Sequence, residues 1–382
     1  MRRIPTPLRG LIVVTALYGF LVGVALLEAG IAAMGEGFEQ GLLASVSNPM
    51  AGLFAGVLAT VLVQSSSVST ATIVGLVGAG TLPVGLAVPM VMGANIGTTV
   101  TNTLASLGSL RRPDQFRRAF AAATMHDFFN LMAVGVLLPL ELISARVMDL
   151  ESGKGILAYL ATRLTEVLRG TEIDVDPGTS PLRQMVRVPA GWVSDAITGA
   201  IDFGVVAGIT LLVLGLALIF AALAGVTKNM RELVAGSVER VMNRMIGRGG
   251  GFVGILVGVA VTVAVQTSTI TTSILVPLVA AGVLSLRNAY PITLGANIGT
   301  TLTALLASLA VIHPEGLTIA LVHTLFNVTA ISLLYPIKRV REIPLTIAML
   351  LADQAVRRRS IVVAYIIGMF ILVPALGVLL LR

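Results

Sequence analysis

The chain has 382 residues, of which 56% are hydrophobic, 40 are glycine and only 12% are charged. That charged fraction is about half the ~25% found in soluble domains, and a mean hydropathy of +0.95 excludes a water-soluble fold. The apolar runs are long and unbroken, which excludes a β-barrel, because a barrel requires alternating patterning. We therefore predict an all-α polytopic membrane protein that lies in a lipid bilayer.

The formal net charge is +7, and Lys and Arg cluster in short segments between the apolar runs. The positive-inside rule explains these clusters without nucleic acid. The chain has no cysteine and three histidines, which excludes disulfides and Cys-ligated metals, and we expect no transition-metal site. Walker-type loops, His/Glu metal motifs and nucleophile elbows are also absent from the sequence, so we expect no enzyme activity, no ATP-driven pumping and no cofactor.

The first predicted element is a membrane span over residues 11–34. Its apolar stretch is longer than the core of a signal peptide, and basic residues precede it, so we place the N-terminus in the cytoplasm. Next come a re-entrant helical hairpin over residues 50–82, interrupted by a polar stretch, and a broken helix over residues 84–108. Together these elements form a first repeat, residues 1–140.

The rest of the chain repeats this pattern after a connecting segment. Residues 141–202 carry nine of the 19 acidic residues and are predicted to be extracytoplasmic. The second repeat covers residues 203–345, with a hairpin over 252–284 and a broken helix over 289–311. Residues 346–382 hold a basic segment and a terminal membrane helix, which ends outside unless Pro374 turns the chain back.

The two repeats share three polar motifs. Residues 93–107 and 295–309 are identical at 12 of 15 positions, and the other two motifs align in the same order. The aligned pairs are Gln64–Thr70 with Gln266–Thr272, and His126–Asn130 with His323–Asn327. The positions of the basic clusters indicate that the first repeat begins outside the membrane and the second begins inside, so the repeats run in opposite directions. Inverted repeats with broken helices near the bilayer midplane are typical of secondary transporters.

The first motif, Gln64–Thr70, places five hydroxyls and an amide between apolar helices. Such groups are costly in hydrocarbon unless they are paired or line a wet cavity. At a helical break they offer O–H donors and free N–H groups to an anion, and their oxygens can coordinate a monovalent cation. The alternative is that these side chains form hydrogen bonds between helices, but the duplication of the whole cluster favours ion binding.

The second motif, Gly93–Thr99, combines glycines with an amide and hydroxyls in mid-span. Glycine permits a helix to unwind and expose backbone groups, whereas a small-residue contact face would explain the glycines alone. The polar residues of this segment and just after it favour binding; they are Asn95, Thr98 and Thr101, with Asn297, Thr300 and Thr303 as their counterparts in the second copy.

Asp127, in the third motif, is an intramembrane carboxylate, which by default indicates a functional site for a cation or a proton. The aligned residue, Thr324, is neutral. The repeated polar blocks contain no Lys or Arg, so a bound anion would be held by dipoles and neutral donors. Co-bound cations would offset its charge, which makes binding of the two ions mutually dependent.

The combined motifs resemble those of a bacterial member of the type II sodium/phosphate cotransporter family. The resemblance covers about residues 48–141 and 250–345. Besides the duplicated motifs it rests on Arg117-Arg-Ala-Phe120, Thr124–Asn130, Leu137–Glu141 and Ala289–Gly295. It implies sodium-driven import of inorganic phosphate by alternating access, in the inner membrane of a bacterium.

The resemblance also implies ligands. Phosphate would contact Ser65, Ser66, Ser67, Ser268 and Thr269, to which we add Asn95 and Asn297. One sodium site would comprise Gln266, Thr267, Thr300 and Thr303, and another Thr98, Asp127 and Asn130, with Gln64 as a further sodium ligand. The alternatives are a sodium-coupled carrier of another small oxyanion or carboxylate, an anion channel and an intramembrane hydrolase.

Overall fold

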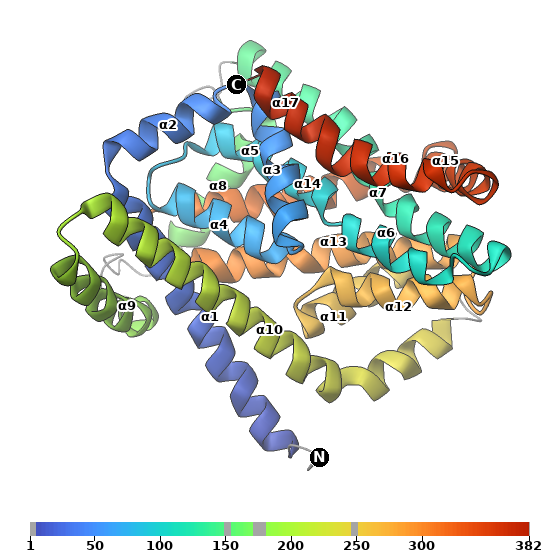
Figure 1. Cartoon of the computed structure of the whole chain (residues 1–382), viewed down its shortest axis with the longest axis horizontal. Helices are drawn as coiled ribbons and strands as arrows, with labels where there is room; N and C mark the ends of the chain where they lie inside the picture. Colours follow the sequence, from blue (N-terminus) through green and yellow to red (C-terminus); the bar gives the residue numbers. More distant parts are fainter. Residues whose placement is uncertain (1–4, 149–153, 171–180, 246–250, 382) are drawn as a thin grey trace.

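A computed structural model describes residues 5–148, 154–170, 181–245 and 251–381. These residues form helices joined by short turns, with no β-strand among them (Figure 1), which confirms the all-α prediction. In chain order the helices are α1 (Thr6–Met34), α2 (Glu36–Val46), α3 (Pro49–Val63), α4 (Ser66–Gly78), α5 (Val84–Gly97), α6 (Val100–Ser106), η1 (Leu107–Ser109), α7 (Pro113–Val147), α8 (Ile156–Gly170), α9 (Pro181–Ala200), α10 (Gly204–Met245), α11 (Gly251–Val265), α12 (Ser268–Ala280), α13 (Leu286–Ser308), α14 (Glu315–Leu334), α15 (Lys338–Arg357), α16 (Ser360–Ile367), η3 (Gly368–Leu372) and α17 (Val373–Leu381).

Six segments of the described chain are long and apolar enough to cross a membrane. They are Thr6–Met34, Val84–Ser109, Pro113–Val147, Gly204–Leu233, Glu315–Leu334 and Ser360–Leu381. Four shorter apolar helices, α3, α4, α11 and α12, have 13 to 15 residues each, which is below the ~20 that a full span needs. The multi-span membrane class is therefore confirmed, and the short helices form two hairpins.

The hairpins are interrupted where the polar stretches lie. α3 ends at Val63 and α4 begins at Ser66, while α11 ends at Val265 and α12 begins at Ser268. Each pair begins one residue before its predicted range, 50–82 or 252–284, and ends inside it. The predicted domain boundaries at 140 and 345 fall inside α7 and α15, so each repeat continues into the neighbouring segment without a break in the helix.

The helix after each hairpin is broken in the first copy only. α5 and α6 are separated at Thr98 and Thr99, whereas α13 runs continuously from Leu286 to Ser308 across the predicted break in 289–311. The residues at the break are the same in both copies, and the sequences differ just after it, where Asn102 and Thr103 of the first correspond to Ala304 and Leu305 of the second. In the first copy the Thr99 N–H bonds the Ile96 carbonyl at 3.4 Å, only three residues back, and the Asn102 N–H likewise bonds the Thr99 carbonyl at 3.1 Å, a 3₁₀-type tightening of the helix.

The glycines of the duplicated motif are packing contacts. A Cβ atom on Gly93 would overlap the Leu53 carbonyl of α3, and one on Gly295 would overlap the Ile255 carbonyl of α11. Gly56 and Gly258 make the reciprocal contacts with α5 and α13. Both motifs are helical at these glycines, so their role is close helix approach, and unwinding at the glycines, the other reading of the sequence, does not occur.

The two halves exchange contacts across the molecule. α4 packs against α13 and α14 of the second repeat, and α12 packs against α6 and α7 of the first. α1 and α10 lie against each other (Figure 1), with Gly30 against the backbone of Leu212 and Gly215 against that of Leu27. Each hairpin is therefore held between both repeats.

The segments outside the repeats also pack onto them. α8 lies against α14 and α7, and α9 lies against α1, so residues 141–202 contain two docked helices. The last helix continues past Pro374 without turning back, after a π-helical turn at Gly368–Leu372. That turn accommodates a proline that can neither donate an N–H nor fit an ideal helix. Figure 1 shows this helix lying across α3.

Candidate functional site

Each hairpin is broken at a glutamine in the left-handed helical conformation. Gln64 has φ 53° and Gln266 has φ 59°, and they are the only non-glycine residues with positive φ in the described chain. A single left-handed residue ends a helix at a cost of about 1–2 kcal/mol for a residue with a Cβ. The next residues, Ser65 and Thr267, are extended, with φ −148° and −155°. Two strained breaks at equivalent positions indicate that the break itself has a role.

The break leaves the first turns of α4 and α12 with N–H groups that have no intrahelical partner. In α4 one of them is capped, because the Ser65 Oγ accepts from the Val68 N–H at 3.3 Å. Thr267 makes no such cap. Both helix starts therefore offer N–H donors and the positive end of a helix dipole, which together suit an anion.

The motif hydroxyls fall into two groups. Deeper ones return to their own helix, as Thr70 does to the Ser66 carbonyl at 2.8 Å and Thr272 to the Ser268 carbonyl at 2.8 Å. The hydroxyls nearest the breaks make no hydrogen bond within the described residues. They belong to Ser66, Ser67, Thr267, Ser268 and Thr269, all of them buried or partly buried. The break-proximal group therefore has donors and lone pairs that no described residue uses.

Asn95 and Asn297 occupy a buried network that joins the halves. The Asn297 Oδ1 lies 2.5 Å from the His126 Nε2, and its Nδ2 donates to the Asn130 Oδ1 at 2.8 Å. The Asn130 Nδ2 donates to the Asn95 carbonyl at 2.8 Å. The His323 Nε2 lies 3.4 Å from the Asn95 Oδ1. The two histidine–asparagine contacts cross between repeats, so the asparagine side chains bond to histidines rather than to the break-proximal hydroxyls.

Asp127 is fully buried on α7 and contacts a helix that belongs to neither repeat. Its Oδ2 accepts from the Tyr365 hydroxyl at 2.6 Å and lies 3.5 Å from the Thr103 Oγ1. Its Oδ1 has no partner within the described residues. Sequence reasoning missed both residues. Tyr365 lies in no motif shared by the repeats, and Thr103 lies at one of the three positions where residues 93–107 differ from 295–309.

The predicted sodium ligands keep oxygen atoms available. The hydroxyls of Thr98 and Thr300 donate to the carbonyls of Ala94 and Ala296 at 2.9 Å and retain acceptor lone pairs. The Gln266 Nε2 donates to the Val263 carbonyl at 2.8 Å, which leaves its buried Oε1 without a partner. The Thr303 Oγ1 is also buried and unpartnered, whereas Gln64 is exposed. Buried oxygens without donors suit a hard cation.

Comparison with known proteins gives one family. A family model described as Na+/Pi-cotransporter matches residues 20–162 and 218–352. The chain is 34% identical to sodium-dependent phosphate transport protein 2A of Rattus norvegicus over 390 residues, which cover 87% of this chain and 61% of that protein. It is 33% identical to protein 2A of Oryctolagus cuniculus over 427 residues (96% and 66%). It is 32% identical to sodium-dependent phosphate transport protein 2B of Homo sapiens over 405 residues (86% and 58%).

The chain thus spans about six-tenths of the length of these relatives. No solved structure matches it. The family match includes both broken hairpins, the duplicated glycine motif and the two histidine–asparagine pairs.

Proposed function

Because the chain belongs to the Na+/Pi-cotransporter family, we propose that it is a symporter that carries inorganic phosphate across a membrane with Na+, without catalysing a reaction. The observation that carries this proposal is the pair of broken hairpins. Their break-proximal hydroxyls are buried or partly buried and make no hydrogen bond within the described residues. Groups of this kind are retained in an apolar interior only where they meet a ligand or water.

In this proposal the phosphate is held by neutral donors. Ser66 and Ser67 on α4, and Ser268 and Thr269 on α12, supply O–H groups, and the first-turn N–H groups of both helices supply the rest. Ser65 contributes through the backbone, since its hydroxyl already caps α4. The repeated motifs contain no Lys or Arg, so the anion needs co-bound Na+ to offset its charge, and each ion raises the affinity for the other.

Two groups of oxygen ligands are proposed for Na+. One comprises Gln266, Thr267, Thr300 and Thr303, where the Gln266 Oε1 and the Thr303 Oγ1 lack partners. The other is centred on Asp127, whose Oδ1 is free within the described chain, with Thr98 and Asn130. The charge of Asp127 has no equivalent at Thr324, so the two sites differ in charge.

For the path of transport we propose inverted repeats with an N-terminus in the cytoplasm of a bacterium. The exchange of contacts between α4 and the second repeat, and between α12 and the first, supports a two-fold relation of the halves. In alternating access, one half rocks against the other around a site between them.

The proposal is tested by single Ser66→Ala and Ser268→Ala substitutions in proteoliposomes with an imposed Na+ gradient. Losing a hydrogen bond to a charged ligand costs about 1.5–3 kcal/mol, so phosphate uptake should fall roughly tenfold or more. Thr72→Val is the matched control, because the Thr72 hydroxyl donates to the Val68 carbonyl of its own helix at 2.9 Å. Wild-type uptake in both alanine variants would refute the site. Phosphate flux without Na+ would indicate a channel. If another oxyanion or a carboxylate competes more strongly than phosphate, that anion is the substrate.

Asp127→Asn tests the charged sodium site. The substitution keeps the shape of the side chain and removes the charge, so the dependence of uptake on Na+ concentration, or the charge moved per phosphate, should change. Uptake and current recorded together from the same proteoliposomes measure both quantities. If both stay at wild-type values, Asp127 is not a sodium ligand.

A further inference from the structure

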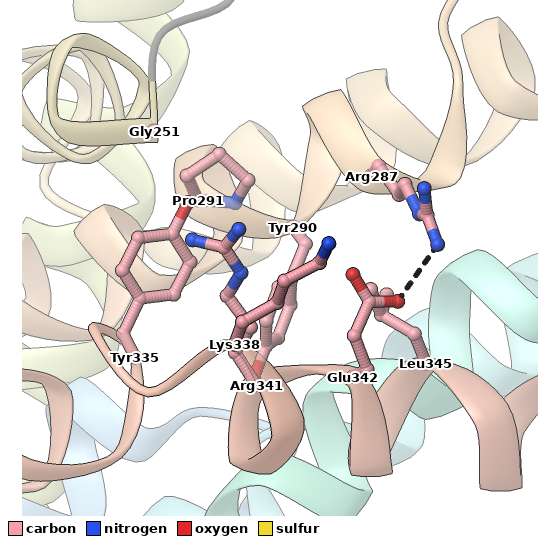
Figure 2. Close-up of a pocket in the computed structure, with 9 residues that line it drawn as sticks. All are labelled: Gly251, Arg287, Tyr290, Pro291, Tyr335, Lys338, Arg341, Glu342 and Leu345. Atoms are coloured by element: carbon pink, nitrogen blue, oxygen red, sulfur yellow. Dashed lines mark hydrogen bonds and ion pairs between the residues drawn. The ribbon is translucent and has the colours of Figure 1, made fainter.

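Charged side chains gather away from the hairpin breaks, in a cavity of about 210 Å³ between the starts of α11, α13 and α15. Figure 2 shows its side chains from α13 and α15 facing one another: Arg287 and Tyr290 from α13, Lys338, Arg341 and Glu342 from α15, and Tyr335 just before α15. The volume is far above the roughly 10–15 Å³ that one water needs. Arg287 and Thr300 are separated by 13 positions of α13, or about 20 Å of helix, so this cavity is distinct from the site of the duplicated motifs.

The cavity carries an excess of positive charge. Arg287 pairs with Glu342 at 3.1 Å (Figure 2), which neutralises one of its three cations. Lys338 and Arg341 form no ion pair within the described residues. The Arg341 guanidinium instead lies over the Tyr335 ring, 5.5 Å from its centroid. Two positive charges in this cavity therefore have no ion-pair partner among the described residues.

The backbone adds to this field. α15 has 20 residues and begins at Lys338, with no acidic residue in its first turn. Cations at a helix N-terminus are unfavourable, because the helix dipole is positive there. The first-turn N–H groups also lack intrahelical partners. A bound anion here would compensate both these side chains and the dipole.

Aromatic packing fixes the shape of the cavity. The Tyr290 and Tyr335 rings lie 5.9 Å apart, and Tyr290 is only 1% exposed, with a hydroxyl that has no partner within the described chain. A Cβ atom on Gly251, where α11 begins, would overlap the Tyr335 hydroxyl, so the helix start closes tightly on this ring. The three cations stand on the helices α13 and α15 rather than on a loop.

We propose that this basic pocket, formed by Arg287, Lys338, Arg341 and the start of α15, binds a doubly charged phosphate group. Its two uncompensated positive charges match a phosphate dianion, and Arg341 presents a planar fork that suits phosphate oxygens. The group comes either from free inorganic phosphate or from the phosphomonoester headgroup of a lipid. This binding does not depend on the proposed transport function, since the pocket lies outside the hairpin motifs.

The test measures both sources on the purified full-length chain. Equilibrium dialysis against radiolabelled inorganic phosphate in sodium-free detergent solution probes free phosphate. Native mass spectrometry of protein released from nanodiscs that contain phosphatidic acid or only phosphatidylcholine probes the lipid. The variants are Lys338→Gln/Arg341→Gln and, as a matched control, Arg339→Gln, an exposed cation of the same helix turn that does not line the pocket. Lys338→Gln alone, at an exposed side chain, keeps the test valid if the double variant does not purify.

Each lost charge-assisted contact should weaken binding roughly tenfold or more, and binding should weaken further with added salt. We expect at least one probe to bind the wild type and Arg339→Gln, and to be lost in the double variant or weakened in Lys338→Gln. Binding of phosphate alone identifies the free ion as the ligand, and binding of phosphatidic acid alone identifies the headgroup. The proposal is overturned if neither probe binds the wild type, or if binding survives in the double variant. If the double variant does not purify, unchanged binding in Lys338→Gln overturns it. The effect of Ser66→Ala on transport does not bear on this binding test, because Ser66 lies outside the basic pocket.

Discussion

Replacing Asn297 by alanine should destabilise the protein more than the same substitution at Asn95, although both residues occupy one position of the duplicated motif. Asn297 contacts His126 at 2.5 Å and donates to Asn130 at 2.8 Å. Alanine at this position leaves two buried polar groups without partners. The Asn95 side chain makes one long contact, 3.4 Å to His323, and its Nδ2 already lacks a partner within the described residues.

The contacts set the size of the difference. Leaving a buried polar group unsatisfied costs about 1–3 kcal/mol, but interhelical hydrogen bonds in membrane proteins average about 0.6 kcal/mol, because the unfolded state finds other partners. Two lost partners therefore give about 1–4 kcal/mol for Asn297→Ala, against about 0.5 kcal/mol or less for Asn95→Ala. The volume removed is the same, and the residues are 2% and 3% exposed, so the cavity cost largely cancels.

Equilibrium unfolding in mixed dodecylmaltoside and dodecyl sulfate micelles, followed by circular dichroism, measures both variants against the wild type. A double-mutant cycle with His126→Ala isolates the pair, and its coupling energy should account for a large part of the Asn297 loss. Equal losses at the two positions, or a larger loss at Asn95, would show that the network does not stabilise the fold as its geometry indicates.

Two further predictions use the same equilibrium unfolding measurement. Gly295→Ala should cost about 1–3 kcal/mol, because its Cβ would overlap the Ile255 carbonyl, whereas Gly135→Ala, where nothing lies within 4 Å of the added Cβ, should be neutral or stabilising by up to about 1 kcal/mol; a harmless Gly295→Ala would contradict this reading of the motif. The hydrogen bond from Arg117 holds the pKa of Asp353 below its usual value. Their ion pair therefore stabilises the protein at a pH above the pKa of an unfolded aspartate, about 3.9. This stabilisation is lost as the pH falls through the lower pKa of the folded state. The two side chains are 47% and 39% exposed, which limits the stabilisation to about 0.5 kcal/mol. The difference in unfolding free energy between wild type and Asp353→Asn should therefore vanish at low pH. A difference that does not change with pH would exclude the ion pair as its source.

The two helix breaks were predictable because their cause is local. A run of hydroxyls and an amide inside apolar sequence has no favourable place in a continuous membrane helix, and the duplication marked both runs. The structure places positive φ at Gln64 and Gln266, at the first residue of each run. The all-helical, multi-span class was equally predictable from the apolar composition.

The role of the motif glycines could not be decided from the sequence, because close helix approach and helix unwinding use the same residue. The facing carbonyls of Leu53 and Ile255 decide it in favour of approach. The contact between Asp127 and Tyr365 depends on where the last helix docks, which no local pattern predicts. The basic pocket at Lys338 and Arg341 was hidden for the same reason, since the sequence shows these residues only as part of a charged cluster.

The asymmetry between the halves therefore lies in residues that the duplication does not share. Both halves use the glycine motif for the same packing and the histidine–asparagine pairs for crossed contacts. Asp127, however, accepts from Tyr365 of a helix outside both repeats, while the aligned Thr324 donates to the Ala320 carbonyl of its own helix at 3.1 Å. The added helix thus supplies the shorter of the two hydrogen bonds that this buried carboxylate accepts, the other coming from Thr103 at 3.5 Å. Any difference in cation binding between the halves should thus depend on Tyr365 as well as on Asp127.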